Sequence, residues 1–146
     1  MKKFLVLLIL PMILLLASCQ VKDLNGPDNY ELATYTLEDI KNKKIDSNSS
    51  VGRVESGFLD HGFLKVKKFS GQRTIVNRKV TSGDKVTITS VVESGNLAIF
   101  VKCGDNYSKI PLNTEYVFEY NEYSGSTSII VVGESARFRV DYNFEK

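Results

Sequence analysis

The feature that most constrains this fold is the strict alternation of apolar and polar residues in "ARFRVDYNFE", residues 136–145. Successive side chains of a β-strand point to opposite faces, so this pattern predicts a strand with one dry and one wet face. The segments "DKVTITSVV" (84–92) and "TEYVFEYNE" (114–122) alternate in the same way. "STSIIVVG" (126–133) is apolar on both sides, which favours a central strand covered on both faces.

Short glycine-containing segments separate these runs: "TSGD" (81–84), "ESGN" (93–96), "CGDN" (103–106), "YSGS" (123–126) and "GES" (133–135). Glycine adopts positive φ at low cost, so each segment predicts a turn, and "SGN" and "GES" predict tight hairpins. The strand spacing indicates an all-β antiparallel sandwich of about eight strands over residues 51–146. No amphipathic helix interrupts this region, so a parallel βαβ architecture is not expected.

Residues 19–50 have a different composition, polar and broken by Gly26 and Pro27, which is typical of a flexible tether. One short helix is expected within the tether. Thr36 is suited to cap it, Glu38 and Asp39 suit the positive end of the helix dipole, and lysines follow at 41, 43 and 44. A helix this short is marginal alone, so it either docks on the domain or frays.

The N-terminus has the three parts of a secretory signal, predicted here as residues 1–18. Lys2 and Lys3 precede an apolar run from Phe4 to Leu16, interrupted only by Pro11. Thirteen helical residues span about 20 Å, which is short of a hydrocarbon core roughly 30 Å thick. The run therefore indicates a cleaved signal and not a permanent membrane span.

The residues after this run, Leu16-Ala17-Ser18-Cys19, resemble the lipobox of bacterial lipoproteins. The resemblance implies that a diacylglyceryl group is attached to the Cys19 thiol and that the chain is cut directly before it. Cys19 would then anchor the protein through at least two palmitate-type acyl chains, enough for stable membrane attachment. The alternative is an ordinary signal peptide, cleaved near Ser18, that is followed by a cysteine by chance.

The net charge of the mature chain argues against nucleic acid as a partner. Cleavage at Cys19 would remove two of nineteen basic residues and none of seventeen acidic ones, so the 128-residue mature chain has zero formal net charge. Nucleic-acid binding is therefore not expected, because it requires a concentrated basic face.

A second resemblance covers residues 69–145. Phe69-Ser70-Gly71, the Gly83-Asp84 turn, Gly95-Asn96-Leu97 and Gly133-Glu134-Ser135 follow one another in the order found in small β-sandwich modules of exported bacterial proteins. Lipoproteins of Gram-positive surfaces and prepeptidase C-terminal domains have similar layouts. This resemblance implies a jelly-roll-like or immunoglobulin-like sandwich and no defined activity.

No catalytic or metal-binding set emerges from the sequence. His61, the single histidine, lies in the turn "LDHGF", and nothing pairs it with Cys103 or a serine. Cys103 falls on the apolar side of "NLAIFVKC", so we interpret it as an inert core residue. One histidine and one free cysteine do not make a zinc site, and "DLNGPDN" lacks the spacing of a calcium loop. We expect no enzyme activity, no cofactor and no metal.

Recognition is the remaining class of function. Tyr120 and Tyr123 are candidates for a ligand-binding rim, although a core or sandwich-edge role for Tyr116, Phe118 and Tyr120 is favoured. The basic residues at 65, 67, 68, 73, 78 and 79 are candidates for one positive strand face, although a solvated outer face is favoured.

The sequence thus predicts a non-catalytic binding or interaction module of the cell envelope. Its partners would be the lipid bilayer, through Cys19, and an envelope protein or glycan. It would sit on the outer face of the cell membrane, or on the outer membrane of a diderm host. A structural or stress-related component without a specific small ligand is the alternative.

Overall fold

The computed structural model describes residues 32–45 and 48–146. The lipobox Leu16–Cys19 and the apolar run before it lie outside these residues. The residues that it describes form one short helix and seven strands: α1 (Leu37–Lys41), β1 (Ser49–Val51), β2 (Val54–Gly57), β3 (His61–Val80), β4 (Lys85–Cys103), β5 (Asn106–Ile110), β6 (Glu115–Glu119) and β7 (Gly125–Glu145).

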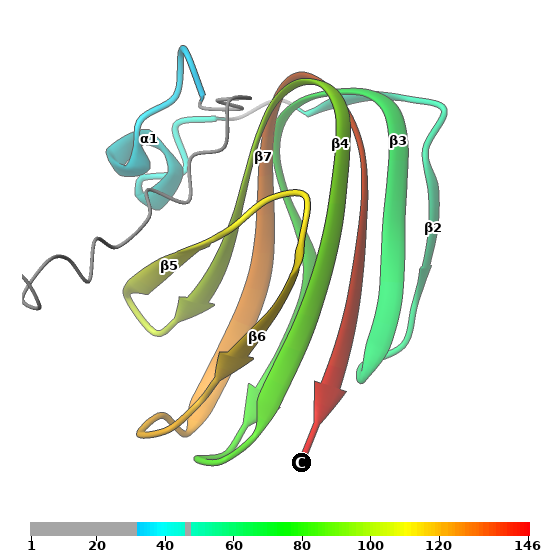
Figure 1. The fold of residues 1–146 in the computed structure, drawn as a ribbon. Helices are drawn as coiled ribbons and strands as arrows, with labels where there is room; N and C mark the ends of the chain where they lie inside the picture. The colour runs from blue at the N-terminus through cyan, green and yellow to red at the C-terminus, as the bar shows by residue number, and fades with distance from the viewer. Residues whose placement is uncertain (1–31, 46–47) are drawn as a thin grey trace, which may run out of the picture.

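All strand pairs are antiparallel, and they form a single sheet with the order β1-β3-β7-β4-β5. β2 pairs with β3 and β6 pairs with β4 outside this path. The prediction of an all-β antiparallel fold is confirmed. β3, β7 and β4 lie side by side and are far longer than the other strands, so they carry the architecture (Figure 1).

The predicted hairpins at "SGN" and "GES" are wrong, because both segments lie inside continuous strands. Val92 and Leu97, on either side of "SGN", pair with the same neighbour, β7. Register shifts occur here in β4, and Gly95 has a φ of +75° and Ser135 a φ of +52°. These are bulges that bend long strands. Positive φ occurs in bulges as well as in tight turns. Segments that were predicted as separate strands are therefore joined into longer ones, and the described residues form seven strands where about eight were expected.

The bends of the three long strands are adjacent, because Gly133 of β7 pairs with Gly71 of β3 and with Leu97 of β4. The strands arch over at this line, and each contributes to two layers (Figure 1). Layer A contains β2, β3 to residue 66, β7 from residue 136, β4 to residue 92, and β6. Layer B contains the remaining parts of β3, β7 and β4, and β5. The result is a sandwich whose layers are joined by shared strands.

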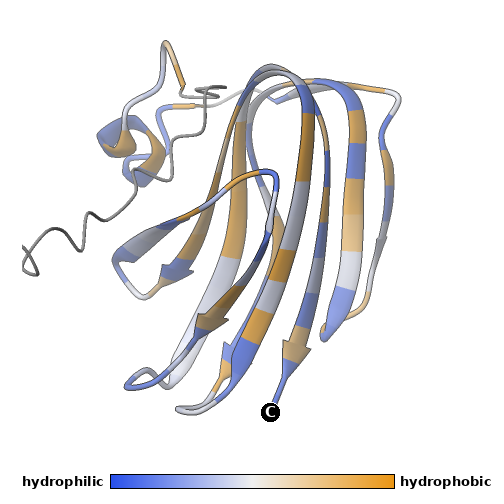
Figure 2. Ribbon diagram, in the orientation of Figure 1, coloured by the Kyte–Doolittle hydropathy of each residue, from blue (hydrophilic) through white to orange (hydrophobic). Residues whose placement is uncertain are grey.

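The main core lies between the two layers. It combines residues of layer A such as Val86 and Val140 with residues of layer B such as Val101 and Ile129. Figure 2 shows the corresponding alternation of hydrophobic and hydrophilic residues along the strands. Tyr120, which is 1% exposed, crosses the core, and its Oη lies 3.2 Å from Oγ1 of Thr127 in layer B.

A second, smaller core lies on the outer face of layer B. Ile130 and Val132 of β7 pack there with Ala98, Phe100 and Ile40 of α1. The apolar run at 126–133 is therefore covered on both faces, as predicted. The predicted helix is also confirmed, with a capping box between Thr36 and Asp39. It docks on the sheet through Ile40, so the described part of the expected tether includes a segment packed against layer B.

The acidic side chain of Glu134 holds the chain that precedes α1. Its carboxylate accepts hydrogen bonds from the backbone amides of Ala33 (2.7 Å), Thr34 (2.6 Å) and Tyr35 (3.3 Å). Burial acts to raise the pKa of Glu134, but these amides and Asn96 outweigh it and hold the pKa below its usual value. The chain is thus fixed at the bend of the sheet before it reaches α1.

Candidate binding groove

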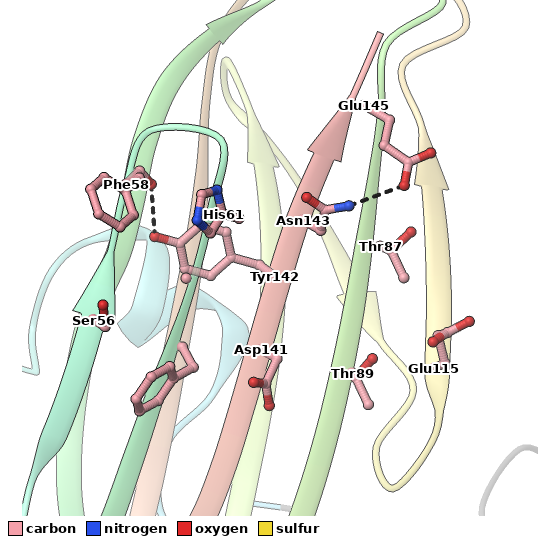
Figure 3. A pocket seen from close by; sticks show the side chains of 12 residues that line it. Ser56, Phe58, His61, Thr87, Thr89, Glu115, Asp141, Tyr142, Asn143 and Glu145 are labelled. Atoms are coloured by element: carbon pink, nitrogen blue, oxygen red, sulfur yellow. Dashed lines mark hydrogen bonds between the residues drawn. The ribbon is translucent and has the colours of Figure 1, made fainter.

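The outer face of layer A carries an open groove of about 710 Å³. Within the described residues, no helix or loop covers this face in the way that α1 covers the outer face of layer B. Figure 3 shows Phe58 and His61 on one side, Glu115 on the other, and Asp141 and Asn143 between them. The groove is lined by residues from β2, β3, β7, β4 and β6 and from the turn before β3: Ser56, Phe58, His61, Gly62, Phe63, Thr87, Thr89, Glu115, Asp141, Tyr142, Asn143 and Glu145.

Strand register arranges the floor of the groove in two rows. The first row crosses five strands at Ser56, Phe63, Asp141, Thr89 and Glu115, which are paired in that order. The second row runs next to it through the paired residues His61, Asn143, Thr87 and Val117. Five members, Phe63, Asp141, Thr89, Asn143 and Thr87, are each one position away from a buried core residue. Period-two alternation therefore brings their side chains to the outer face.

The wall of the groove on the β2 side is aromatic. The rings of Phe58 and His61 lie with their centroids 5.0 Å apart. Phe58 is 65% exposed and its neighbour Leu59 is 72% exposed, which is unusual for large apolar residues. The side chain of His61 is 58% exposed and its Nδ1 lies 2.9 Å from Oδ1 of Asp60. The wall therefore presents ring surface to the groove and to solvent.

Several hydrogen bonds hold this wall in place. The backbone amide of Phe58 donates to the carbonyl of His61 at 2.7 Å, and Phe144 donates to the carbonyl of Asp60 at 2.6 Å. Tyr142 Oη donates to the carbonyl of Phe58 at 3.2 Å. Burial, followed by the nearby carboxylates of Asp60 and Glu55, raises the pKa of Tyr142, so its hydroxyl stays protonated and able to donate.

A residue of layer B also holds the turn between β2 and β3, which carries Phe58 and Leu59. Arg78 Nη1 donates to the carbonyl of Leu59 at 3.1 Å, and its guanidinium lies 4.5 Å from the centroid of the Phe144 ring. Further along β3, Arg73 forms an ion pair with Glu55 of β2 at 2.8 Å. Two arginines of layer B thus reach the edge of layer A, and one of them fixes the backbone of the exposed turn.

The carboxylates of the floor differ in how far they are already occupied by hydrogen bonds within the protein. Asp141 forms two hydrogen bonds with Arg139, at 2.6 and 2.8 Å, and this pair raises the pKa of Arg139. The Arg139 guanidinium also lies 4.7 Å from the centroid of the Phe63 ring. Glu145 accepts a hydrogen bond from Nδ2 of Asn143 at 3.1 Å. Glu115 and Glu145 form no ion pair with any residue in 32–45 or 48–146.

The groove is acidic as a whole, since its lining contains three carboxylates and neither lysine nor arginine. Arg139 offsets the charge of Asp141, which leaves Glu115 and Glu145. The remaining lining groups are hydroxyls, one amide and aromatic rings. Such a set binds by hydrogen bonds and by ring contact. Within the described residues no cluster of three or more His, Cys, Asp or Glu side chains is placed to hold a metal ion.

Two of the residues considered for catalysis lie in different layers. His61 is exposed at the turn, as expected, but it also lines the groove. Cys103 is partly buried at the end of β4 in layer B, where its Sγ lies 3.7 Å from Oγ1 of Thr127. Burial raises the pKa of this thiol, which lowers its reactivity at neutral pH. The structure therefore does not bring His61 and Cys103 together.

The residues considered for recognition are also dispersed. Tyr120 belongs to the core, and Tyr123 is partly buried with its Oη bonded to the carbonyl of Ser126. The favoured core or sandwich-edge role is correct, because Tyr120 lies in the core, Phe118 packs against it, and Tyr116, which is 37% exposed, lies on the edge strand β6. Among the basic residues, Lys65 lies on the outer face of layer A, whereas Arg73 and Arg78 reach across the sandwich edge. These residues do not form one positive face.

Apart from His61, the residues that form the groove were not singled out in the sequence. Thr87, Thr89, Asp141 and Asn143 are the polar positions of the two clearest alternating strands. They were recognised as a wet face, but the neighbours of each strand were unknown. The exposure of Phe58 could have been predicted, because an aromatic residue directly before a predicted turn has no strand partner to bury it.

No helix in the described part of the chain is long and apolar enough to cross a membrane.

Comparisons with known proteins identify no family. No protein-family model matches the chain, and no curated protein matches it significantly. Among solved structures, a protein of unknown function (DUF1255) from Acidithiobacillus ferrooxidans is similar over 68% of this chain and 94% of its own. The sequences are 12% identical and the TM-score is 0.25. A likeness of this degree supports no inference about fold or function.

Proposed function

We propose that this protein is a lipoprotein of the bacterial cell envelope, anchored through Cys19, whose sandwich binds an envelope ligand in the groove of layer A without catalysing a reaction. The observation that carries the binding role is the unequal covering of the two layers. α1 and the chain around it cover the outer face of layer B, whereas no part of residues 32–45 or 48–146 covers the groove of layer A. An open groove with convergent polar groups and exposed rings is the usual form of a binding site.

The route of the chain supports this arrangement. Residues 33–35 are bonded to Glu134 at the bend, and α1 lies on layer B. The anchored N-terminus would thus lead to the bend and to the face opposite the groove. A ligand in the cell wall or outside it could then reach the groove without competing with the anchor for space.

The anchor itself is supported by the lipobox resemblance at Leu16–Cys19. It is tested by expressing the full-length precursor in bacteria and measuring the intact mass of the membrane-bound product. The expected mass is that of residues 19–146 plus a diacylglyceryl group, and Cys19→Ser should leave the precursor uncut. Recovery of a chain with an unmodified Cys19 thiol would refute the anchor.

Binding is tested with the mature chain, residues 19–146, carrying Cys19→Ser so that it is not acylated. Co-sedimentation with isolated envelopes of the producing bacterium should be saturable. Thr87→Arg places a long cationic side chain in the centre of the groove and should weaken this binding at least tenfold. Thr74→Arg is the matched control, because Thr74 is an exposed threonine of β3 in layer B.

Equal loss of binding in the two arginine variants, or no saturable binding at all, would refute the proposed function. The second result, together with a correctly acylated Cys19, would favour a structural envelope component without a specific ligand.

A further inference from the structure

We infer that the groove of layer A takes a saccharide chain that carries no anionic groups. This inference rests on the proposed function, because it names the class of ligand for the same groove. Three observations converge on it: an exposed and fixed aromatic wall, a floor of mixed donors and acceptors, and a lining without cationic side chains.

The aromatic wall suits the apolar face of a sugar ring. A pyranose presents C–H groups on its faces and hydroxyls around its rim, so it packs against an aromatic ring while its rim stays free for hydrogen bonds. Phe58 is 65% exposed and makes its ring contact with His61 at 5.0 Å. Its backbone is fixed by Tyr142 and by the carbonyl of His61. Because the backbone is already ordered, little conformational entropy is lost when a ring packs against this wall.

The floor suits the hydroxyl rim of a sugar. Thr87, Thr89 and Ser56 each donate and accept, Asn143 does both through its amide, and Glu115 and Glu145 accept. Neighbouring strands lie about 4.8 Å apart and alternate residues about 7 Å apart, so these groups form a grid of polar contacts. A ligand with several hydroxyls on each ring can bond to this grid at several points, whereas an apolar ligand would leave it unsatisfied.

Charge excludes the acidic polymers of the envelope. Glu115 and Glu145 repel phosphate and carboxylate groups, and the guanidinium of Arg139, next to the floor, is already paired with Asp141. A uronate or a polyol phosphate would bring negative charge to a groove whose lining contains no lysine or arginine to receive it. An uncharged saccharide meets no such penalty.

The exposed Phe58 and Leu59 could also serve a lipid surface, but the groove argues against this occupant. The two residues stand beside Asp60 and the acidic groove, and an anionic lipid surface attracts basic residues and repels acidic ones. Vesicle binding is therefore included in the test as a competing outcome.

The test uses the mature chain with Cys19→Ser in calorimetric titrations. The ligands are neutral hexose and N-acetylhexosamine hexasaccharides, together with an oligogalacturonate of the same length. A separate arm measures co-sedimentation with vesicles of phosphatidylglycerol and phosphatidylcholine. At least one neutral saccharide should bind at least tenfold more tightly than the oligogalacturonate, and vesicles should not bind.

Variants place this binding in the groove. Phe58→Ala should weaken saccharide binding at least tenfold, and Thr87→Arg should abolish it, while Thr74→Arg should leave it unchanged. Far-UV circular dichroism and thermal melting of each variant confirm that it is folded. An unchanged affinity in Phe58→Ala would contradict the inference even if the saccharide binds.

The outcomes also separate this inference from the proposed function. Groove-dependent binding to envelopes without binding to any neutral saccharide, or with equal binding to the oligogalacturonate, would overturn the inference and leave the proposed function standing. Vesicle binding that is lost in Phe58→Ala would overturn it in favour of a lipid surface. Absence of any groove-dependent binding to envelopes would overturn both.

Discussion

The hydroxyl of Tyr142 lies 3.2 Å from the carbonyl oxygen of Phe58, across 84 residues of sequence. Through this bond a mostly buried residue of β7 holds the backbone of the exposed aromatic wall. The core and the groove are therefore coupled at this point, and a substitution of Tyr142 should change the affinity of the groove for its ligand.

Tyr142→Phe removes this bond and keeps the ring in the core. We expect a loss of stability of about 1 kcal/mol, typical of one hydrogen bond, and a several-fold weaker affinity for the groove ligand, because Phe58 is less well fixed. Thermal melting and calorimetric titration measure the two effects. An unchanged affinity would show that the bond does not position the wall.

Gly62 and Gly57 provide a matched pair that tests the close packing around the same hydroxyl. A Cβ on Gly62 would lie 2.6 Å from both Tyr142 Oη and the carbonyl oxygen of Ser56, whereas a Cβ on Gly57 would meet only Tyr142 Oη, at 2.8 Å. Overpacking against backbone is hard to relieve, so Gly62→Ala should cost about 2–3 kcal/mol and Gly57→Ala about 1 kcal/mol. Urea unfolding measures the difference, and equal costs would contradict this account.

Glu134 should control the attachment of the chain at residues 33–35. Its pKa is held below the ordinary value of 4.5, so the carboxylate is bonded and ionised at neutral pH. A depressed pKa means that the stabilisation is present above the unfolded-state pKa and is lost as pH falls through the folded-state pKa. The amide protons of Ala33 and Thr34 should therefore shift upfield in an NMR titration only below pH 4.5.

Glu134→Gln is the matched variant for that titration. It keeps the shape of the side chain and removes the charge, so the shifts of these amides should no longer titrate. We expect the attachment to weaken by about 1–2 kcal/mol, since hydrogen bonds to a charged group are lost. Amide exchange at residues 33–35 should be faster than in the parent chain, and unchanged protection would contradict the role of Glu134.

Tyr120 should make the fold sensitive to alkaline pH. Burial raises its pKa to about 12, against an ordinary value of 10. Between these two values the unfolded chain releases a proton that the folded chain keeps, so stability should fall as pH rises above 10. Tyr120→Phe should make the dependence of Tm on pH less steep in this range, and Tyr142, whose pKa burial also raises, should keep part of the slope. Tyr107→Phe, on the outer face of layer B, is the control and should keep the slope of the parent chain.

Several elements could be predicted because their signals are local. The alternation at 136–145 and 84–92 depends only on the period of a strand, and the Thr36 cap depends only on residues within one turn. The two-sided apolar run at 126–133 predicted a strand covered on both faces, which α1 and the main core provide.

The hairpins at "SGN" and "GES" failed for a physical reason. A residue with positive φ reverses the chain in a hairpin and bends it in a bulge, and the local sequence is the same in both cases. The outcome depends on whether the flanking segments pair with each other or with a common neighbour. Val92 and Leu97 both pair with β7, so the chain bends and continues.

The amino-acid sequence alone determined that this chain forms antiparallel strands, which side of the strands at 84–92 and 136–145 is buried, and that a capped helix precedes them, because these properties depend on residues close together in the chain. The tertiary structure alone decided that the long strands arch into both layers and that Phe58, Asn143, Thr87 and Glu115 share one groove. Asn143, Thr87 and Glu115 come from separate strands and Phe58 from the turn before β3, so only the register between strands, set by packing across the whole sheet, brings them together.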